Sequence, residues 1–210
     1  MPRCAGYCRG ARSDCPERRI RAGDGDRRRG RAQGQVDADL PARGRRQVSL
    51  LPKDLAKLAE RVIDENRKAG RMIALAESCT GGLVAAALTE IPGSSDVLDR
   101  GFVTYSNEAK IEALGVSADI IETFGAVSIA CAWAMAQGAL KRSNSQVAVA
   151  ISGIAGPGGG TDLKPVGTVV FARAVAGSEE TVGEERHFAA SSRDAVRHQA
   201  ALVALELLLP

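Results

Sequence analysis

Apolar residues recur along the chain with two spacings, one typical of helices and one typical of strands. A helical spacing of three and four positions predicts a first helix, which starts near Pro52 and ends before Gly70. Its apolar face comprises Leu51, Leu55, Leu58, Ala59, Val62 and Ile63. Further helices are predicted over 83–88, from the N-cap Ser106 to Gly115, after Ser128, and after Ser191, where Ser191 and Asp194 have capping-box spacing.

The predicted strands lie between these helices. Apolar runs predict buried strands at residues 72–76 and 147–151, and residues 101–105 are predicted to form a further strand. Segments 167–175 and 181–188 alternate apolar and polar residues, and Gly177-Ser178 joins them as a hairpin. Helices that alternate with strands indicate an α/β fold. We therefore expect a single layered domain with a mixed sheet flanked by helices.

The composition divides the 210-residue chain at residue 48. Residues 1–47 hold 13 Arg, no Lys and 6 acidic residues, a net charge of +7, whereas residues 48–210 hold 15 basic and 19 acidic residues, a net charge of −4. The first segment has few large aliphatic residues, so we interpret it as a disordered extension. Because no methionine lies between Met1 and Met72, Val48 is a candidate initiator. We expect the organised domain to span residues 48–210.

The same patterns argue against several classes of partner. Acidic residues are scattered among the arginines of the extension, which disfavours a nucleic-acid arm. No apolar run approaches the ~18 residues of a membrane-spanning helix. The cysteines and histidines lack metal-ligand spacing, so we expect no metal and no cofactor. Apolar surfaces on the Ala-rich helices hint at a homo-oligomer.

Two Gly-rich polar turns follow buried strands, where α/β domains bind ligands. The first contains Cys79, Thr80, Gly81 and Gly82 and opens a helix, so its N–H groups, those of Thr80 and Gly81 in particular, could bind a phosphate or an oxyanion. The second contains Ser152, Gly153, Gly156, Gly158, Gly159, Gly160 and Thr161. The alternative is that these glycines serve only to permit tight turns.

Ser78 is the first candidate nucleophile, and Cys79 is its rival at the same helix start. A serine needs a base, but the two histidines, His187 and His198, fall on a late strand and the last helix. A buried lysine with a lowered pKa can replace histidine. Helix positions leave two lysines open for this role, Lys110 and Lys164.

The motifs in these turns resemble those of the CinA C-terminal domain family. The similar blocks are AESCTGG at 76–82, GFVTYSNEAK at 101–110, GAVS at 125–128, SGIAGPGGGT at 152–161 and KPVGTV at 164–169. Many stand-alone members of the family are nicotinamide-nucleotide amidohydrolases. The resemblance therefore implies a cytoplasmic enzyme whose small-molecule substrate is nicotinamide mononucleotide, which it converts to nicotinic acid mononucleotide and ammonia.

The resemblance also implies roles for individual residues. It places the nucleophile on Ser78, the base on Lys110 and a positioning tyrosine on Tyr105. Relatives often carry Gly-Asp before a late arginine, whereas this chain has Ala190-Ser191-Ser192 before Arg193. The competing interpretation is a non-catalytic nucleotide- or phosphate-binding module that acts with competence or recombination partners, a role that would not require the pair of Ser78 and Lys110.

Overall fold

The computed structural model describes residues 50–178, 182–189 and 192–210. Residues 1–47, interpreted above as an extension, lie outside this part of the chain, as does Ser191. The described elements follow one another in the order α1 (Lys53–Lys68), β1 (Ile73–Glu77), α2 (Leu83–Thr89), the 3₁₀ turn η1 (Ser94–Asp96), β2 (Leu98–Val103), α3 (Asn107–Leu114), α4 (Ala118–Phe124), α5 (Ile129–Lys141), β3 (Val147–Gly153), β4 (Thr168–Val175), β5 (Val182–His187) and α6 (Arg193–Leu207).

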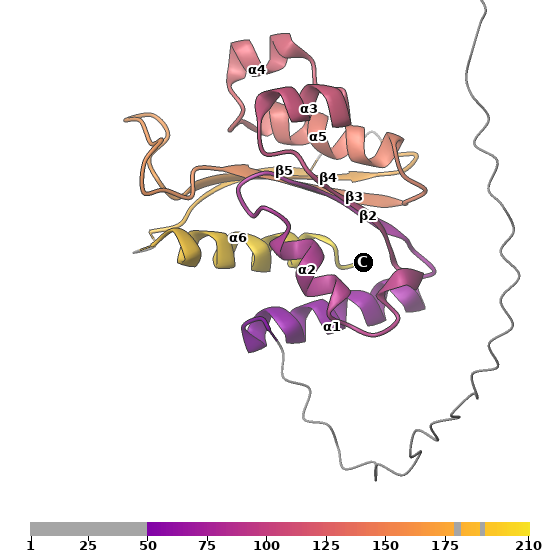
Figure 1. Ribbon diagram of the computed structural model, residues 1–210. Coiled ribbons are helices and arrows are strands. Elements are labelled where there is room, and N and C mark those ends of the chain that lie inside the picture. The colour runs from indigo at the N-terminus through magenta and orange to yellow at the C-terminus, as the bar shows by residue number, and fades with distance from the viewer. Residues whose placement is uncertain (1–49, 179–181, 190–191) are drawn as a thin grey trace, which may run out of the picture. The chain divides into compact units, whose positions relative to one another are not determined.

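The described strands form one five-stranded sheet in the order β2-β1-β3-β4-β5. β1 runs parallel to both of its neighbours, and β4 and β5 are antiparallel, so the sheet is mixed as predicted. Helices α1, α2 and α6 lie on one face and α3, α4 and α5 on the other (Figure 1). The chain therefore leaves β1 over one face and leaves β2 over the opposite face.

The two faces of the sheet carry side chains of different size. On the α5 face the central strands present small residues, which are Ala74, Ala76, Ala148, Ala150 and Ala172. On the α1 and α6 face they present larger ones, which are Ile73, Leu75, Val149, Ile151 and Phe171. Small side chains let α5 pack close to the sheet, whereas the larger ones build the main core under α1 and α6.

Several predicted boundaries shift in the structure. β2 begins at Leu98 rather than at residue 101. α4 was not predicted: it is only seven residues long, none of them is buried, and Ile120 and Ile121 are only partly buried. The N-cap of α6 is Ser192, not Ser191: its hydroxyl accepts a hydrogen bond from Ala195 N at 3.4 Å. The predicted N-cap Ser106 is confirmed, and Ser128, after which a helix was predicted, is the N-cap of α5.

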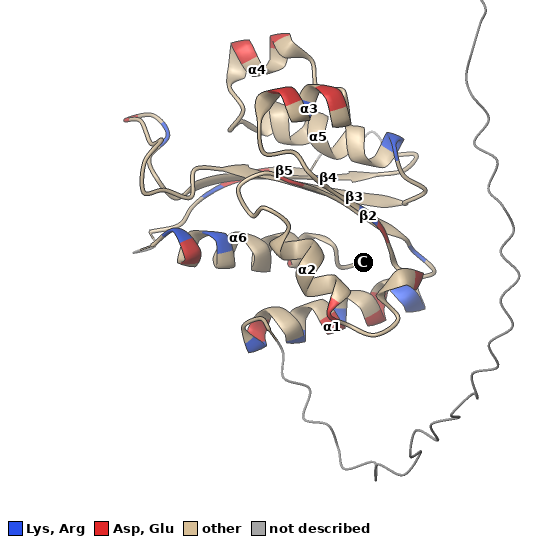
Figure 2. Ribbon diagram, viewed as in Figure 1, with Lys and Arg blue, Asp and Glu red and all other residues tan. Residues whose placement is uncertain are grey.

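Charged residues concentrate on the helices and are rare on the central strands (Figure 2). β1 and β3 together carry one charged side chain, that of Glu77. Among the described residues, no helix combines the length and apolarity needed to cross a lipid bilayer.

Candidate active site

The candidate site lies where the three parallel strands end. Ser78 directly follows β1, and its N–H donates to Ile151 O of β3 at 2.9 Å. On the other side of β1, Thr104 N donates to Glu77 O at 2.8 Å. Residues that follow β2, β1 and β3 are therefore held side by side. Ligands bind at this edge of the sheet in open α/β folds, at the point where the connections that leave two neighbouring strands pass over opposite faces. Here those strands are β1 and β2.

Lys110 reaches Ser78 from α3. Its Nζ lies 3.2 Å from Ser78 Oγ and 3.0 Å from the carbonyl oxygen of Thr104. Two longer contacts join the same nitrogen to the carbonyl oxygens of Tyr105 at 3.4 Å and Ser106 at 3.3 Å. Only 1% of Lys110 and 7% of Ser78 is exposed. The structure thus brings together two buried residues that lie 32 positions apart in the sequence.

Burial controls the protonation of Lys110. Desolvation is the largest influence on its pKa and lowers it below the usual value of 10.5, while Cys131, Cys79 and Glu108 act in the opposite direction to a smaller extent. Among the described residues no carboxylate forms an ion pair with Lys110. A neutral amine here can donate two N–H groups to carbonyl oxygens and still accept a proton from the Ser78 hydroxyl.

A cavity of about 210 Å³ opens beside this pair. Several predicted site residues line it, namely Ser78, Lys110, Tyr105, Cys79, Ser152 and Gly153. Further residues that line it are Asn107, Ala126, Val127, Ala155 and Arg193. Ser152 Oγ donates to Ala126 O at 2.7 Å and so joins β3 to the turn before α5.

Arg193 and Tyr105 interact at the rim of the cavity. Arg193 Nη2 donates to the Tyr105 hydroxyl at 2.8 Å, and Arg193 Nη1 donates to Gly156 O at 2.7 Å. Tyr105 is 60% exposed, so its ring lies at the surface, whereas its carbonyl oxygen contacts Lys110. The start of α6 thereby connects the segment after β2 to the second Gly-rich loop. Sequence reasoning found this arginine only through the resemblance.

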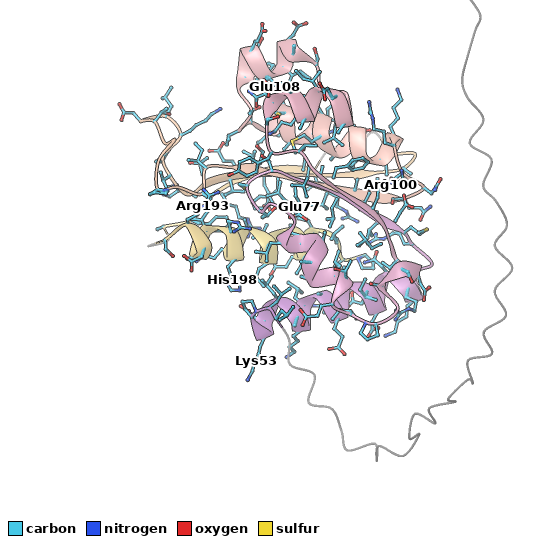
Figure 3. All side chains as sticks on the ribbon, in the orientation of Figure 1. Lys53, Glu77, Arg100, Glu108, Arg193 and His198 are labelled. Atoms are coloured by element: carbon cyan, nitrogen blue, oxygen red, sulfur yellow. The ribbon has the colours of Figure 1, made fainter. Side chains whose placement is uncertain are left out.

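The first Gly-rich turn is bonded internally. Glu77, 1% exposed, accepts hydrogen bonds from the N–H groups of Gly82, Val84 and Ala85 at 3.0, 3.2 and 2.9 Å. Figure 3 shows Glu77 in the interior, between the sheet and the helices below it. Gly81 N donates to Ser78 O at 3.0 Å. Of the two predicted anion donors, Gly81 N is therefore occupied, whereas Thr80 N has no partner among the described residues.

Thr80, Gly81 and Gly82 do not belong to the cavity wall. Gly81 and Gly82 have φ values of 60° and 91°, a left-handed conformation that glycine adopts without steric cost. These two glycines let the chain turn sharply from β1 into α2. Glu77, not a substrate group, takes the helix N–H groups. In the sequence, this role of Glu77 could have been suspected from its position as the one acidic residue at the end of an otherwise apolar strand.

The second Gly-rich loop contributes mainly through its first residues. Gly158, Gly159, Gly160 and Thr161 lie outside the cavity wall, and Thr161 N donates to Lys164 O at 2.9 Å. Lys164 Nζ donates to Val127 O at 2.6 Å and to Phe124 O at 3.0 Å. Of the two lysines left open by the sequence, Lys110 contacts Ser78 and Lys164 ties the loop to the turn before α5.

Cys79 is a poor rival to Ser78. It is 5% exposed, and burial raises the pKa of its thiol to about 11, so the thiol stays protonated at neutral pH. Cys131 is also buried as a free thiol. Within residues 50–178, 182–189 and 192–210, no three residues of the types His, Cys, Asp and Glu are grouped so as to hold a metal ion.

Fold and site together define a class of protein: α/β domains in which a serine at the end of a central parallel strand meets a buried lysine from the helix that follows the neighbouring strand. The particular family is identified by its sequence model. The CinA C-terminal domain model matches residues 55–210, and the chain belongs to that family.

Similar proteins fall into longer and shorter types. A putative competence-damage inducible protein from Symbiobacterium thermophilum is 50% identical over 145 residues, which are 66% of this chain and 34% of that protein. The chain thus spans about a third of the length of such relatives. Nicotinamide-nucleotide amidohydrolase PncC from Escherichia coli K12 is 48% identical over 155 residues, 74% of this chain and 93% of PncC.

Solved structures show the same architecture. The competence/damage inducible protein CihA from Agrobacterium tumefaciens superposes with a TM-score of 0.74 at 49% sequence identity, over 76% of this chain and 96% of that one. A CinA superfamily protein from Escherichia coli gives a TM-score of 0.70 at 35% identity, over 77% of this chain and 92% of that one.

Proposed function

We propose that the chain is an amidohydrolase that deamidates nicotinamide mononucleotide to nicotinic acid mononucleotide and ammonia. The observation that carries the proposal is the distance of 3.2 Å between the nitrogen of buried Lys110 and the Ser78 hydroxyl oxygen. Similarity to PncC supplies the substrate class, because PncC matches along 93% of its length. A module that only binds nucleotides would not need this pair.

In the first step Ser78 Oγ attacks the amide carbon while Lys110 Nζ takes the serine proton. The lowered pKa of Lys110 suits it to this role, because a base must be neutral before it can accept a proton. Negative charge then develops on the amide oxygen.

In the second step the protonated Lys110 gives its proton to the departing ammonia, and an ester joins the nicotinoyl group to Ser78. Water then attacks the ester, Lys110 takes a proton from the water, and the carboxylate leaves as Ser78 regains its hydrogen. The same lysine thus acts once as a base and once as an acid in each half of the reaction.

The cavity fits the reacting part of the substrate. Its volume of about 210 Å³ is below the roughly 300–1,000 Å³ of pockets that enclose whole ligands. We therefore assign the carboxamide and its ring to the cavity, next to Ser78. The ribose phosphate extends past Tyr105 to the rim, where the exposed guanidinium of Arg193 supplies positive charge.

Ammonia release from nicotinamide mononucleotide by the full chain tests the proposal. Ser78→Ala should lower kcat by at least about 10³-fold, and Lys110→Met by about 10²–10⁴-fold, the usual contribution of a general base. Lys141→Met is the matched control, because it removes an exposed lysine at the end of α5 that does not line the cavity. It should keep kcat within a few-fold.

Two results would contradict the proposal. Full activity in Ser78→Ala or Lys110→Met would exclude the pair as nucleophile and base. No ammonia release by the native chain, combined with binding of the nucleotide measured by calorimetry, would favour the non-catalytic binding module.

A further inference from the structure

Arg197 extends from α6 to the turn that carries Ser78, although it does not line the cavity. Its Nη2 donates to Thr80 O at 2.7 Å. A side-chain carbon added to Gly81 would lie 3.6 Å from the same nitrogen, so the guanidinium packs against this turn. Arg197 Nε is buried and has no hydrogen-bond partner among the described residues. The bond to Thr80 O is thus the one polar contact of Arg197 in this part of the chain.

This bond fixes the peptide group between Thr80 and Gly81. Its carbonyl oxygen accepts from Arg197 at 2.7 Å and, in a longer bond of 3.3 Å, from Leu83 N, while its N–H donates to Ser78 O at 3.0 Å. A charged donor on the carbonyl polarises the peptide and strengthens the bond made by its N–H. The main chain of Ser78 is therefore held on both sides, by Ile151 O at its N–H and by the Arg197-supported peptide at its carbonyl.

The docking of α6 does not depend on Arg197. Val196, Ala200, Ala204 and Leu205 are at most 1% exposed and belong to the main core. Apolar burial on this scale holds the helix against the sheet without a polar contact. Removal of the guanidinium should accordingly leave the fold intact and loosen the Thr80–Gly81 peptide, whose carbonyl oxygen then keeps only the longer bond from Leu83 N.

We propose that Arg197 is a positioning residue for the nucleophile: through the Thr80 carbonyl and the Gly81 N–H it holds the main chain of Ser78, and so keeps Ser78 Oγ within reach of Lys110 Nζ. This inference rests on the proposed function, since it assumes that Ser78 is a nucleophile. Arg197 acts on the transition state and not on substrate affinity, because it contributes no atom to the cavity.

The test compares Arg197→Gln and Arg197→Lys with the native chain in two assays. The first measures kcat and KM for ammonia release from nicotinamide mononucleotide. The second measures the rate at which an alkyl fluorophosphonate labels Ser78, in which the serine oxygen bonds to phosphorus, fluoride leaves and the proton passes to Lys110. The labelling rate measures the reactivity of Ser78 itself, so it does not depend on whether nicotinamide mononucleotide is the natural substrate.

Arg71→Gln is the matched control. Arg71 Nη2 also donates to a main-chain carbonyl, Leu208 O at 2.6 Å, in a part-buried setting away from the cavity. Arg197→Gln should lower kcat and the labelling rate together by about 10–100-fold, because small misplacements of reacting groups have effects of that size. KM should stay within about threefold and Tm should match that of Arg71→Gln. Arg197→Lys should recover part of the loss.

Other outcomes would overturn the inference. A rise in KM at constant kcat would make Arg197 a substrate-binding residue, and unchanged kinetics in Arg197→Gln would leave it a surface contact of α6. A large fall in Tm that Arg197→Lys does not restore would make its role purely structural. If the native chain is labelled at Ser78 but releases no ammonia, the proposed function fails while the labelling rates still decide the role of Arg197. If neither reaction occurs, both proposals fail.

Discussion

Glu77→Gln should destabilise the protein strongly, although it changes a single atom. The carboxylate accepts three N–H groups from the start of α2, at 2.9–3.2 Å, and is almost fully buried. A glutamine side chain has one acceptor oxygen, which can take two of these bonds, and its NH₂ group turns a donor toward the third N–H. The substitution therefore weakens two bonds and leaves one buried N–H unpaired.

The size of the effect follows from these three contacts. Hydrogen bonds to a charged group contribute about 1.5–3 kcal/mol and neutral ones about 0.5–1.5, so two weakened bonds cost about 2 kcal/mol. An unpaired buried N–H costs about 1–3 kcal/mol more. We expect the free energy of unfolding to fall by about 3–5 kcal/mol, and Tm to fall by roughly 6–20 °C for a domain of this size.

Urea unfolding followed by circular dichroism measures this change. Glu90→Gln is the matched control, because Glu90 lies at the opposite end of the same helix and accepts its hydrogen bond from Leu50 N at an exposed position. The control should change stability by less than about 0.5 kcal/mol. A loss below about 1 kcal/mol in Glu77→Gln would refute the idea that the carboxylate holds the start of α2.

Three further predictions concern the base, the packing under it and the rival nucleophile. kcat/KM should rise with pH and level off at a pH below 10.5, because burial lowers the pKa of Lys110 and only its neutral amine is active; a flat profile would contradict this. Gly138→Ala should destabilise the fold by about 1–3 kcal/mol in urea, because the added carbon would overlap the carbonyl oxygen of Leu114 at the end of α3. Cys79 should resist iodoacetamide at pH 8 and react only after unfolding, as read by peptide mass spectrometry, because its thiol is buried with a pKa of about 11.

Sequence periodicity predicted the layered architecture well, because helices such as α1 and α6 bury one face and the central strands β1 and β3 are buried on both faces. The run 147–151 reads as a buried strand, and β3 is buried as far as Ser152. α4 escaped prediction since none of its residues is buried. Periodicity indicates which side chains are buried, so it gives little signal for a helix that has no buried residue.

The candidate site was harder to predict from spacing alone. Ser78 was recognisable from its place after a buried strand, but its contact with Lys110 depends on the parallel pairing of β1 and β2. Spacing could not separate Lys110 from Lys164, and only the resemblance to a family did so. Arg197 carried no signal, because a basic residue on an amphipathic helix looks like an ordinary solvated position.

The site draws on two separate stretches of the chain. Ser78 and Lys110 come from the first part of the sheet, within β1, α2, β2 and α3, whereas most of the remaining wall, from Ala126 to Arg193, comes from later segments. Residues of the later stretch that line the cavity without a hydrogen bond to Ser78 or Lys110, such as Ala126 and Val127, can therefore be changed to reshape the pocket without moving the reacting pair. Substrate choice and catalysis could therefore be engineered separately. A library confined to residues 126–128 and 152–156 would vary substrate choice while Ser78 and Lys110 stay unchanged.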